Sequence, residues 1–531
     1  MANIDNSCQV ERPRIVFASV LLGMLVGALN QTVVGTAIPR ITADLNGVAE
    51  YSWVFTSFMI ASAVSLLIFG KLSDMYGRKM FFMGGISILM VGSACAGLSQ
   101  TMLQLILFRV VQGVGAGMLM STSMGIVGDL FPPSEQAKWR ALNQGVFTLA
   151  SIFGPLLGGL LTDHLSWRWV FYINFPVGIA ALTFATLVMP PLRNQRGHGR
   201  IDYFGAAVLI LMVVPLLVAF SCAGTRYPWG SVQIVGMLSF SVAMFLLYVF
   251  AQSKADEPIL SLNLFRNPIF AIVGIANFLL GLGLFGSITY LPLFIQGVQG
   301  QSATNSGIIL MPMMLASFTA GVIGGQLLSR WGRYRILALI SMAVSSIGMF
   351  LLSLMTADTT SATVSINMVI LGLGFGISMP LFFVVVQNAF PQRMVGTVVS
   401  SSAFLRSVGG TLGVAIMGTL VANKFKSGFR ESLSPEIIRA VDDAAIEMPS
   451  SPQALLSSDI MGLLQDAVGP ELSPAMMETM QSTLASALST AFLFSSIALA
   501  VAFVACLFLK EIPLRRSNQE GSSVVESASK Q

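Results

Sequence analysis

The sequence predicts an all-α integral membrane protein with fourteen transmembrane helices, arranged as two pseudo-symmetric six-helix bundles plus two extra central helices. Of its 531 residues, 54% are hydrophobic and only 10% are charged, which is not the composition of a soluble protein. Apolar stretches of roughly 18 residues or more recur along the chain, and each is long enough to cross a hydrocarbon core. An internal repeat, described below, divides these stretches into two related halves.

The predicted spans follow from the apolar runs in order. They are 15–38, 51–70, 80–98, 101–127, 141–162, 169–189, 203–223, 231–251, 268–296, 304–328, 336–355, 362–388, 396–421 and 484–509. An even number of spans places both termini on one side of the membrane. With the N-terminus inside, 20 of the 29 Lys and Arg residues fall in cytoplasmic segments, seven fall outside, and Arg109 and Arg406 lie within spans. This bias follows the positive-inside rule and predicts a multi-pass plasma-membrane protein with cytoplasmic termini.

The spans divide the chain into seven predicted parts. These are a cytoplasmic N-terminus (1–14), an N-terminal six-helix bundle (15–190), two linker helices with flanking loops (191–267), the first five helices of a C-terminal bundle (268–421), an extracytoplasmic helical insertion (422–483), the last transmembrane helix (484–509) and a disordered cytoplasmic tail (510–531). In the insertion, Ser434, Ser451 and Ser473 each precede a proline, a pattern typical of a helix N-cap. A small outer helical cap and a passive spacer are both compatible with this segment.

Composition also excludes several functions. The two histidines lie in loops, and the four cysteines show no metal-ligand spacing or paired framework, so neither a metal site nor a cofactor is expected. No P-loop motif and no cluster of catalytic residue types occurs, which argues against an ATPase or another enzyme. The net charge of +5 reflects basic loops at a membrane surface rather than binding of nucleic acid.

The internal repeat has two independent components. Segment 70–78 recurs as segment 325–333 with the same glycine spacing and an offset of 255 residues, and the Gly-x-Gly-x-Gly run at 113–117 recurs at 372–376 with an offset of 259. Repeated halves with a site between them are typical of secondary transporters. We expect the glycine runs to allow close contact between helices.

A short charged loop joins the second and third spans. Glycine at position 77 suits a positive φ, and the basic residues that follow suit a cytoplasmic face. The loop resembles the G-x-L-x-D-x-x-G-R-K loop of the major facilitator superfamily, which implies the major facilitator fold. The resemblance assigns a conformational or gating role to Gly70, Asp74, Gly77, Arg78 and Lys79. The alternative is a charged anchor that only sets the topology.

The fourth span contains a cation, Arg109, followed by Gln112. A cation within a span costs about 2.5–3.5 kcal/mol on insertion scales and usually faces a cavity or a partner. The repeat places Met368 at the equivalent position of the second half, so the fold itself does not require this charge. We therefore expect a role in transport or coupling, with snorkelling toward the nearby helix end as the alternative.

The fifth span carries a glycine and proline pattern that permits close helix packing and favours a kink. Its residues are Gly145, Gly154, Pro155, Gly158 and Gly159. The pattern resembles the antiporter motif of the superfamily, which is associated with exporters. Together with Ser166-Trp167-Arg168-Trp169, it makes the chain similar to the fourteen-helix drug:proton antiporter branch over about residues 15–421 and the last span.

The first span departs from the pattern of that branch. Asn30 stands where the family usually has an aspartate, and an asparagine side chain cannot titrate. Coupling would then use a carboxylate near a helix end, such as Asp74, Asp129 or Asp163, or a water path. The alternative is that Asn30 only makes a hydrogen bond between helices.

The resemblance implies a monomeric, proton-coupled exporter of amphipathic, lipophilic small molecules that works by alternating access in the lipid bilayer. Candidate cavity residues are Gln31, Asn277, Phe278, Tyr290 and Phe375. An uptake carrier of the same fold is one alternative, which the antiporter motif disfavours. A membrane receptor or scaffold that does not transport is another, and the missing aspartate favours it.

Overall fold

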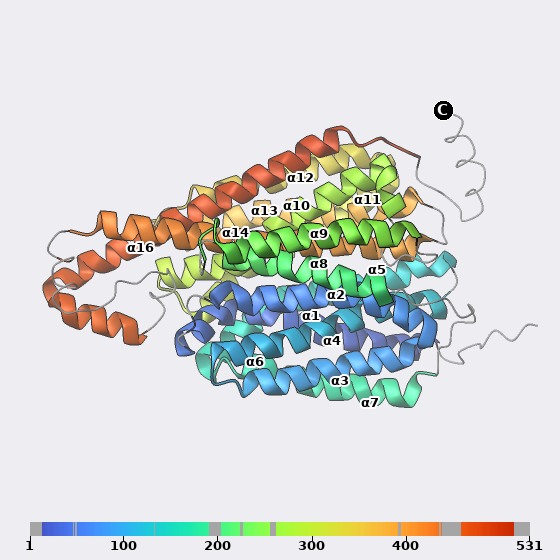
Figure 1. Cartoon of the computed structure of the whole chain (residues 1–531), viewed down its shortest axis with the longest axis horizontal. Helices are drawn as coiled ribbons and strands as arrows, with labels where there is room; N and C mark the ends of the chain where they lie inside the picture. Colours follow the sequence, from blue (N-terminus) through green and yellow to red (C-terminus); the bar gives the residue numbers. More distant parts are fainter. Residues whose placement is uncertain are drawn as a thin grey trace, which may run out of the picture.

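A computed structural model describes residues 13–45, 47, 50–131, 133–190, 203–223, 227–254, 262–390, 394–434, 437 and 458–513. This part of the chain is almost entirely helical (Figure 1). It contains thirteen helices that are long and apolar enough to cross a membrane, together with a shorter apolar helical stretch, Phe204–Phe220. The predicted all-α membrane fold is confirmed. The tail 514–531 and the Ser451 N-cap lie outside the described residues.

The first bundle contains the helices of the N-terminal half. They are α1 (Pro13–Asp44), α2 (Tyr51–Tyr76), α3 (Arg78–Gly97), α4 (Met102–Leu130), α5 (Pro133–His164), α6 (Trp169–Tyr172) and α7 (Asn174–Val188). The short α6 and the longer α7 together form the sixth crossing, with a single residue, Ile173, between them.

The second bundle contains the helices of the C-terminal half. They are the 3-10 helix η2 (Leu262–Arg266), α10 (Pro268–Leu293), the π-helix η3 (Phe294–Val298), α11 (Ala303–Trp331), α12 (Tyr334–Ser353), α13 (Ser361–Asn388), α14 (Val395–Ser432) and α16 (Ser458–Leu507). In this bundle α10 continues into η3, so the first crossing ends in a wider helical turn.

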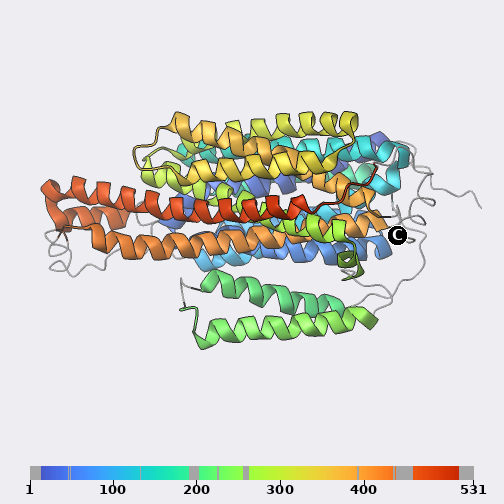
Figure 2. The same ribbon diagram turned by 90° about the horizontal axis from the view of Figure 1, so that it is seen from above.

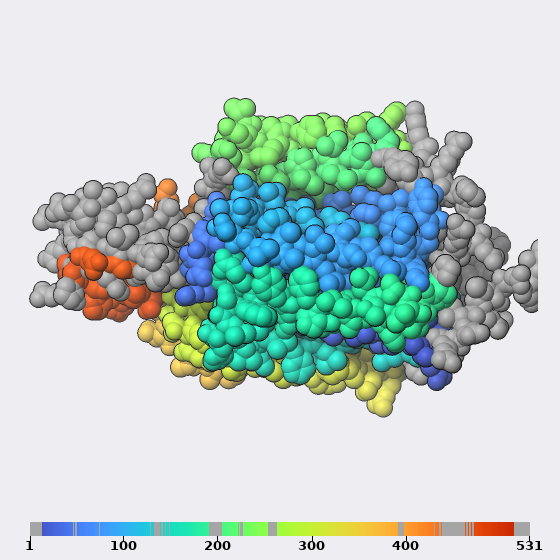
Figure 3. Space-filling model, turned by 90° about the horizontal axis from the view of Figure 1, so that it is seen from below, coloured from blue at the N-terminus to red at the C-terminus, as the bar shows by residue number. Residues whose placement is uncertain are grey.

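Two further helices, α8 (Tyr203–Cys222) and α9 (Val232–Lys254), pair along one side of the molecule (Figure 2). Figure 3 shows them beside the N-terminal bundle. The apolar side chains of α8, such as Val208 and Leu217, pack in one cluster with Leu67 of α2 and Phe404 of α14. The extra pair therefore covers the seam between the two bundles on that side.

Tight turns mark one end of the bundles. Only Gly77 separates α2 from α3, and its φ is 103°, while Gly332 ends α11 with a φ of 66°. The predicted positive φ at Gly77 is confirmed, and Gly332, its partner in the repeat, shares it. Because L-residues with a Cβ rarely adopt these angles, glycine is favoured at both turns. We call this end, which holds basic residues of both turns, the basic end, and the other the opposite end.

The glycine runs of α4 and α13 pack in the same way. A Cβ at Gly113 or Gly117 would overlap carbonyl oxygens of α2, and a Cβ at Gly115 would overlap the α3 backbone. In α13, the equivalent residues Gly372 and Gly376 contact α11, and Gly374 contacts α12. The expected close helix contact is therefore confirmed, and the shared geometry agrees with two related bundles.

The insertion differs from the prediction in its details. Helix α14 does not end near 421 but continues to Ser432, because Phe425 and Phe429 extend its apolar face and Met480 of α16 belongs to the same core cluster. These helices project beyond the bundles (Figure 1). Ser434 accepts a hydrogen bond from the Ile437 amide at 3.4 Å, as its predicted capping role requires.

The predicted helix start at Ser473-Pro474 is wrong. Residues 458–507 form α16, whose one non-helical residue is Gly469, with φ 77° and ψ 168°. Pro470 follows this break directly. A proline is tolerated at the first position of a helix, so Pro470 suits the start of the helical segment that follows the break.

Candidate functional site

Arg109 of α4 lies at the centre of a buried polar network in the N-terminal bundle. Its side chain is fully buried. Nε donates to the Val54 carbonyl oxygen of α2 at 2.9 Å, and Nη1 donates to Asn30 Oδ1 of α1 at 2.8 Å and to Gln112 Oε1 at 3.0 Å. The guanidinium also lies over the ring of Phe58, 4.3 Å from its centroid. Three oxygen acceptors and an aromatic face thus replace water around the cation.

The network continues from Arg109 into α3 and α7. The amide nitrogens of Gln112, Asn174 and Asn30 lie 2.8, 3.3 and 3.4 Å from Ser93 Oγ. A serine hydroxyl has two acceptor lone pairs, so the shortest of these contacts, with Gln112, is the strongest. The amide oxygens of Asn30 and Gln112 face Arg109 and their nitrogens face Ser93, so each amide links the cation to the hydroxyl.

No carboxylate takes part in the described contacts of this network, and Arg109 Nη2 and Asn174 Oδ1 are buried without a hydrogen-bond partner among the described residues. The structure therefore brings Arg109 and Gln112, for which a role in transport or coupling is predicted, together with Asn30. It locates them inside the N-terminal bundle, between α1, α2, α3, α4 and α7.

In the C-terminal bundle, the position that the repeat aligns with Arg109 does not hold a cation. Met368, which the repeat aligns with Arg109, is fully buried in the apolar core. Its neighbour Asn367 donates to the Leu351 carbonyl oxygen at 3.2 Å. The polar network is therefore a feature of one bundle rather than of the fold.

The glycines of α5 pack this helix against α1. A Cβ at Gly154 would overlap Thr32 Oγ1, and one at Gly158 would overlap the Val33 carbonyl oxygen. Gly409 and Gly413, each 255 residues later, meet the Phe278 and Leu282 carbonyl oxygens of α10 in the same manner. This part of the motif therefore serves helix packing common to both bundles.

Other positions of the α5 motif behave differently. Gly159 faces the second bundle, where a Cβ would overlap the Ala303 carbonyl oxygen at the start of α11. The Pro155 carbonyl oxygen accepts a hydrogen bond from Thr36 Oγ1 at 3.1 Å and also contacts Gly307 of α11. At Gly145 a Cβ would meet nothing within 4 Å. The motif thus joins α5 to both α1 and α11.

The charged loop at the basic end forms contacts within its own bundle. Arg78 Nε donates to Asp129 Oδ2 of α4, and a Cβ at Gly125 would overlap the Arg78 side chain. Lys79 Nζ donates to carbonyl oxygens of Thr186 and Met189 at the C-terminal end of α7, where a cation is favoured. Of the two remaining loop residues, Gly70 lies in α2 beside Ser121 of α4, and Asp74 lies in α2 with its side chain outside the described part.

The candidate cavity residues occupy several separate places. Gln31 is half-buried and contacts Met59 Sδ at 3.4 Å, and Asn277 donates to Ser402 Oγ at 3.0 Å between α10 and α14. Phe278 packs at the seam that α8 covers, while Phe375 is buried in the apolar core. Tyr290 lies at the boundary between bundles, where its ring is 5.7 Å from that of Tyr51.

Direct contacts between the two bundles lie toward the opposite end. The Tyr51 hydroxyl donates to the Thr289 carbonyl oxygen at 2.8 Å, and Gln296 Nε2 donates to the Thr36 carbonyl oxygen at 3.1 Å. The rings of Phe55 and Phe285 lie 5.8 Å apart. Sequence reasoning missed these pairs, because nothing in the local pattern of one helix identifies its partner in the other half.

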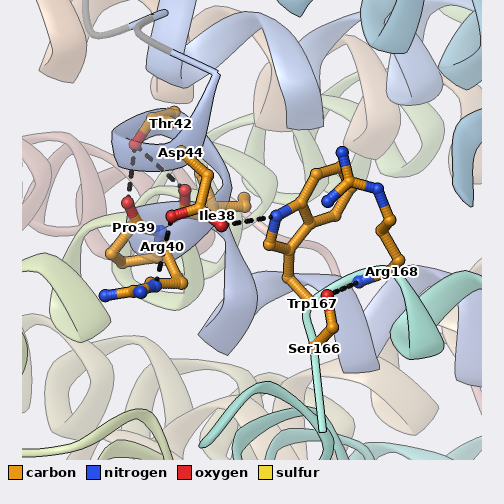
Figure 4. Close-up of polar contacts among 8 residues, drawn as sticks. All are labelled: Ile38, Pro39, Arg40, Thr42, Asp44, Ser166, Trp167 and Arg168. Carbon is orange, nitrogen blue, oxygen red and sulfur yellow. Dashed lines mark hydrogen bonds and ion pairs between the residues drawn. The ribbon is translucent and has the colours of Figure 1, made fainter. Parts of the chain in front are cut away.

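A cavity of about 470 Å³ opens between the bundles at this end. Its lining includes Arg40 and Asp44 from the end of α1, Trp167, and Ser302 from the start of α11. Trp167 Nε1 donates to Asp44 Oδ2 at 2.9 Å, and Arg40 Nε lies 3.3 Å from Asp44 Oδ1 (Figure 4). The Asp44 carboxylate is therefore paired within its own bundle.

The Major Facilitator Superfamily model matches residues 20–414. This chain belongs to the major facilitator superfamily. Within the superfamily, it is 38% identical over 496 residues to multidrug resistance protein 3 of Bacillus subtilis (strain 168), covering 93% of this chain and 95% of that protein. It is 34% identical over 524 residues to the multidrug transporter protein MdtP of the same organism, covering 97% and 96%.

The solved structures show the same facilitator fold. A bacterial homologue of the human lysosomal transporter Spinster, in an inward-facing and unoccupied conformation, matches with a TM-score of 0.67 at 16% identity, covering 96% of this chain and 99% of that one. The predicted superfamily and fold are thus confirmed by sequence and by structure.

Proposed function

We propose that this facilitator exports amphipathic small molecules across the cell membrane in exchange for protons, by alternating access of a path between its bundles. The near full-length similarity to two bacterial proteins named for multidrug resistance and multidrug transport supports the substrate class. We further propose that the basic end faces the cytoplasm, as the distribution of Lys and Arg predicts, and that the protein works as a monomer.

The structural observation that supports a role of this motif in transport is the contact of α5 with α11. Gly154 and Gly158 have counterparts in the other bundle, but Pro155 and Gly159 are replaced there by Gly410 and Val414. These two positions lie at the boundary with α11. Pro155 and Gly159 thus join the two bundles, and the equivalent positions of the other half carry different residues. This difference supports a role for both residues in the transport cycle.

In the proposed orientation, the inter-bundle contacts near Tyr51, Thr36 and Gly159 lie at the extracytoplasmic end. They would separate when the path opens outward. Substrate would enter from the cytoplasm or the inner leaflet and leave when these contacts break. Alternating access requires only that two packings of the same bundles differ by a few kcal/mol, so that ligand and protons shift their populations.

The proposed proton coupling requires a titrating group other than Asn30. Asp129 is paired with Arg78 at the basic end, and Asp163 contacts α11 at the opposite end. These carboxylates and Asp74 are the candidates. The uncompensated cation Arg109 next to Asn30 disfavours a second cation in its vicinity, so we propose neutral or weakly polar substrates rather than dications.

Purified protein in proteoliposomes tests this proposal directly. A neutral lipophilic dye and the cationic dye ethidium would be loaded, and their efflux measured with and without an imposed pH gradient. We expect efflux to accelerate when the gradient drives protons in the opposite direction to the dye. Equal rates with and without the gradient would contradict proton coupling.

The direction of transport and the two alternatives have their own readouts. Inverted membrane vesicles, prepared from cells that express the chain, should accumulate dye when energised if the protein is an exporter. An uptake carrier would instead accumulate dye in right-side-out vesicles. Dye binding without movement in either preparation would identify a receptor or scaffold. Neutralising Asp129 or Asp163 should then show which carboxylate the pH effect requires.

A further inference from the structure

The end of α5 and the beginning of α11 meet across the boundary between the two bundles. On each side a glycine allows the approach: Gly159 faces the Ala303 carbonyl oxygen, and Gly307 faces the Pro155 carbonyl oxygen. A Cβ at either glycine would overlap backbone atoms of the other helix, which cannot move aside as a flexible side chain can. This junction therefore depends on close backbone contact between the bundles.

A carboxylate lies at the same junction. Asp163, near the end of α5, accepts hydrogen bonds from the Thr304 amide through Oδ2 at 2.7 Å and from the Ala303 amide through Oδ1 at 3.3 Å. Ala303 and Thr304 are the first two residues of α11, whose N-cap is Ser302. Amide groups at these positions have no acceptor within their own helix.

Two further backbone amides at the start of α11 are capped within the helix itself. The Ser302 hydroxyl accepts from the Asn305 amide at 3.1 Å, and the Ser302 carbonyl oxygen accepts from the Ser306 amide at 3.0 Å. The capping of this helix is thus divided: its own residue satisfies Asn305, and a residue of the other bundle satisfies Ala303 and Thr304. The negative charge of Asp163 also lies at the positive end of the helix dipole.

We propose that Asp163 is an inter-bundle latch, a positioning residue that stabilises the state closed at the opposite end by capping α11 from the other half of the protein. The latch rests on the alternating-access cycle proposed above. When the bundles separate at this end, Ala303 and Thr304 lose their acceptor to water while the Ser302 cap remains. Breaking the latch therefore favours the state that is open at this end.

The solvent exposure of Asp163 limits how far the latch can shift the populations of the two states. Asp163 is solvent-exposed in the closed state, so water replaces its hydrogen bonds when the contact breaks. Loss of a helix N-cap typically changes an equilibrium by about fivefold. The latch is therefore expected to bias the populations of the two states without locking either.

Double electron–electron resonance can measure this bias in the full chain. Spin labels would be attached at Leu165 and Asn305, which are exposed and lie beyond the junction on opposite bundles. The four native cysteines would first be replaced. In reconstituted protein, Asp163→Ala should shift the ratio of long to short distances by about fivefold toward the open arrangement, because alanine leaves the two backbone amides without a side-chain acceptor.

Asp44→Ala is the matched control, since Asp44 lines the same cavity but its described partners, Trp167 and Arg40, belong to its own bundle. This control should leave the distance ratio unchanged. Asp163→Glu, which keeps a carboxylate at this position, should restore part of the closed population that Asp163→Ala loses. An unchanged ratio in Asp163→Ala, or an equal shift in Asp44→Ala, would overturn the latch. These distances are measured without substrate and without a pH gradient, so failure of the latch is distinguishable from failure of the transport assay.

Discussion

The Nη1 atom of Arg109 lies 2.8 Å from Oδ1 of Asn30, so a fully buried cation has an amide as its partner where the related family pattern has a carboxylate. Its described contacts are all with neutral groups: the Asn30 and Gln112 amides, the Val54 carbonyl and the face of Phe58. Such an arrangement keeps a permanent positive charge inside the N-terminal bundle. It also makes each of those neutral groups energetically important.

Replacement of Arg109 by methionine, the residue found at the equivalent position 368, should destabilise the protein. The change leaves the oxygens of Asn30, Gln112 and Val54 without their donor, and membrane hydrogen bonds are worth about 0.6–1.7 kcal/mol each. We expect a loss of about 1–3 kcal/mol, measured by unfolding in detergent. Met368→Leu, a change of similar volume in the other bundle, serves as control and should cost less than about 1.5 kcal/mol. Equal stability of Arg109→Met and the unmodified chain would show that the network contributes nothing.

Asn30→Asp should strengthen the network. A carboxylate at this position would accept a charge-assisted hydrogen bond from Arg109 and neutralise its charge, and bonds of this kind are roughly twice as strong as neutral ones. The melting temperature in detergent should therefore rise relative to the unmodified chain at neutral pH, whereas Asn30→Ala should lower it. A fall with Asn30→Asp would mean that desolvation of the carboxylate exceeds the gain from pairing.

The same Asn30→Asp variant should change which compounds are exported. Removing the net positive charge near the path should increase efflux of cationic dyes relative to neutral ones, because the repulsion between Arg109 and a cationic cargo is reduced. Efflux rates of a panel of cations and matched neutral compounds in proteoliposomes measure this ratio. If no cation in the panel responds, Asn30 lies outside the transport pathway.

The α5 glycines should respond to substitution according to their neighbours. Gly158→Val should strongly reduce folded protein and transport, since its side chain would overlap the Val33 carbonyl oxygen of α1. Gly145→Ala has open space around it and should keep or raise stability by about 0.5–1 kcal/mol, because alanine is the better helix former. Folded yield by size-exclusion chromatography and dye efflux per molecule measure the two effects. Similar losses in both variants would contradict the packing role.

Gly77→Ala should cost about 1–3 kcal/mol through the backbone alone. Its φ of 103° and ψ of 136° lie where a residue with a Cβ is strained. Gly325→Ala is the control, because that glycine is helical and meets nothing within 4 Å. Thermal unfolding in detergent compares the two, and a penalty for Gly77→Ala no larger than for Gly325→Ala would show that the turn relaxes without strain.

The fold could be predicted in large part because its determinants are local. Hydrophobic length, charge at the helix ends and glycine spacing are properties of short segments, and they predicted the number of crossings, the repeat and the positive φ at Gly77. The break in α16 was misplaced because Ser473-Pro474 and Gly469-Pro470 are both plausible helix boundaries in sequence. α16 packs with the extended α14 in one core cluster. A local sequence pattern does not reveal which helices pack together.

The candidate site was predicted less completely. Arg109, Gln112 and Asn30 stood out as polar residues in apolar spans, but the pattern did not identify Ser93 or Asn174 as partners, since serine and asparagine also occur singly in spans. The proposed cavity residues were chosen by type alone, and the structure distributes them over several places. A shared cavity depends on which helix faces meet, and composition does not encode this.

By itself, the sequence determined that the chain crosses a membrane many times, that its halves are related and that the fourth span carries a cation. Only the tertiary structure decided that Asn30 is the partner of Arg109 and that Asp163 caps a helix of the other bundle. The physical reason is that burial and helix length follow from the chain within one span, whereas a hydrogen bond between residues 79 or 141 positions apart depends on how whole helices pack.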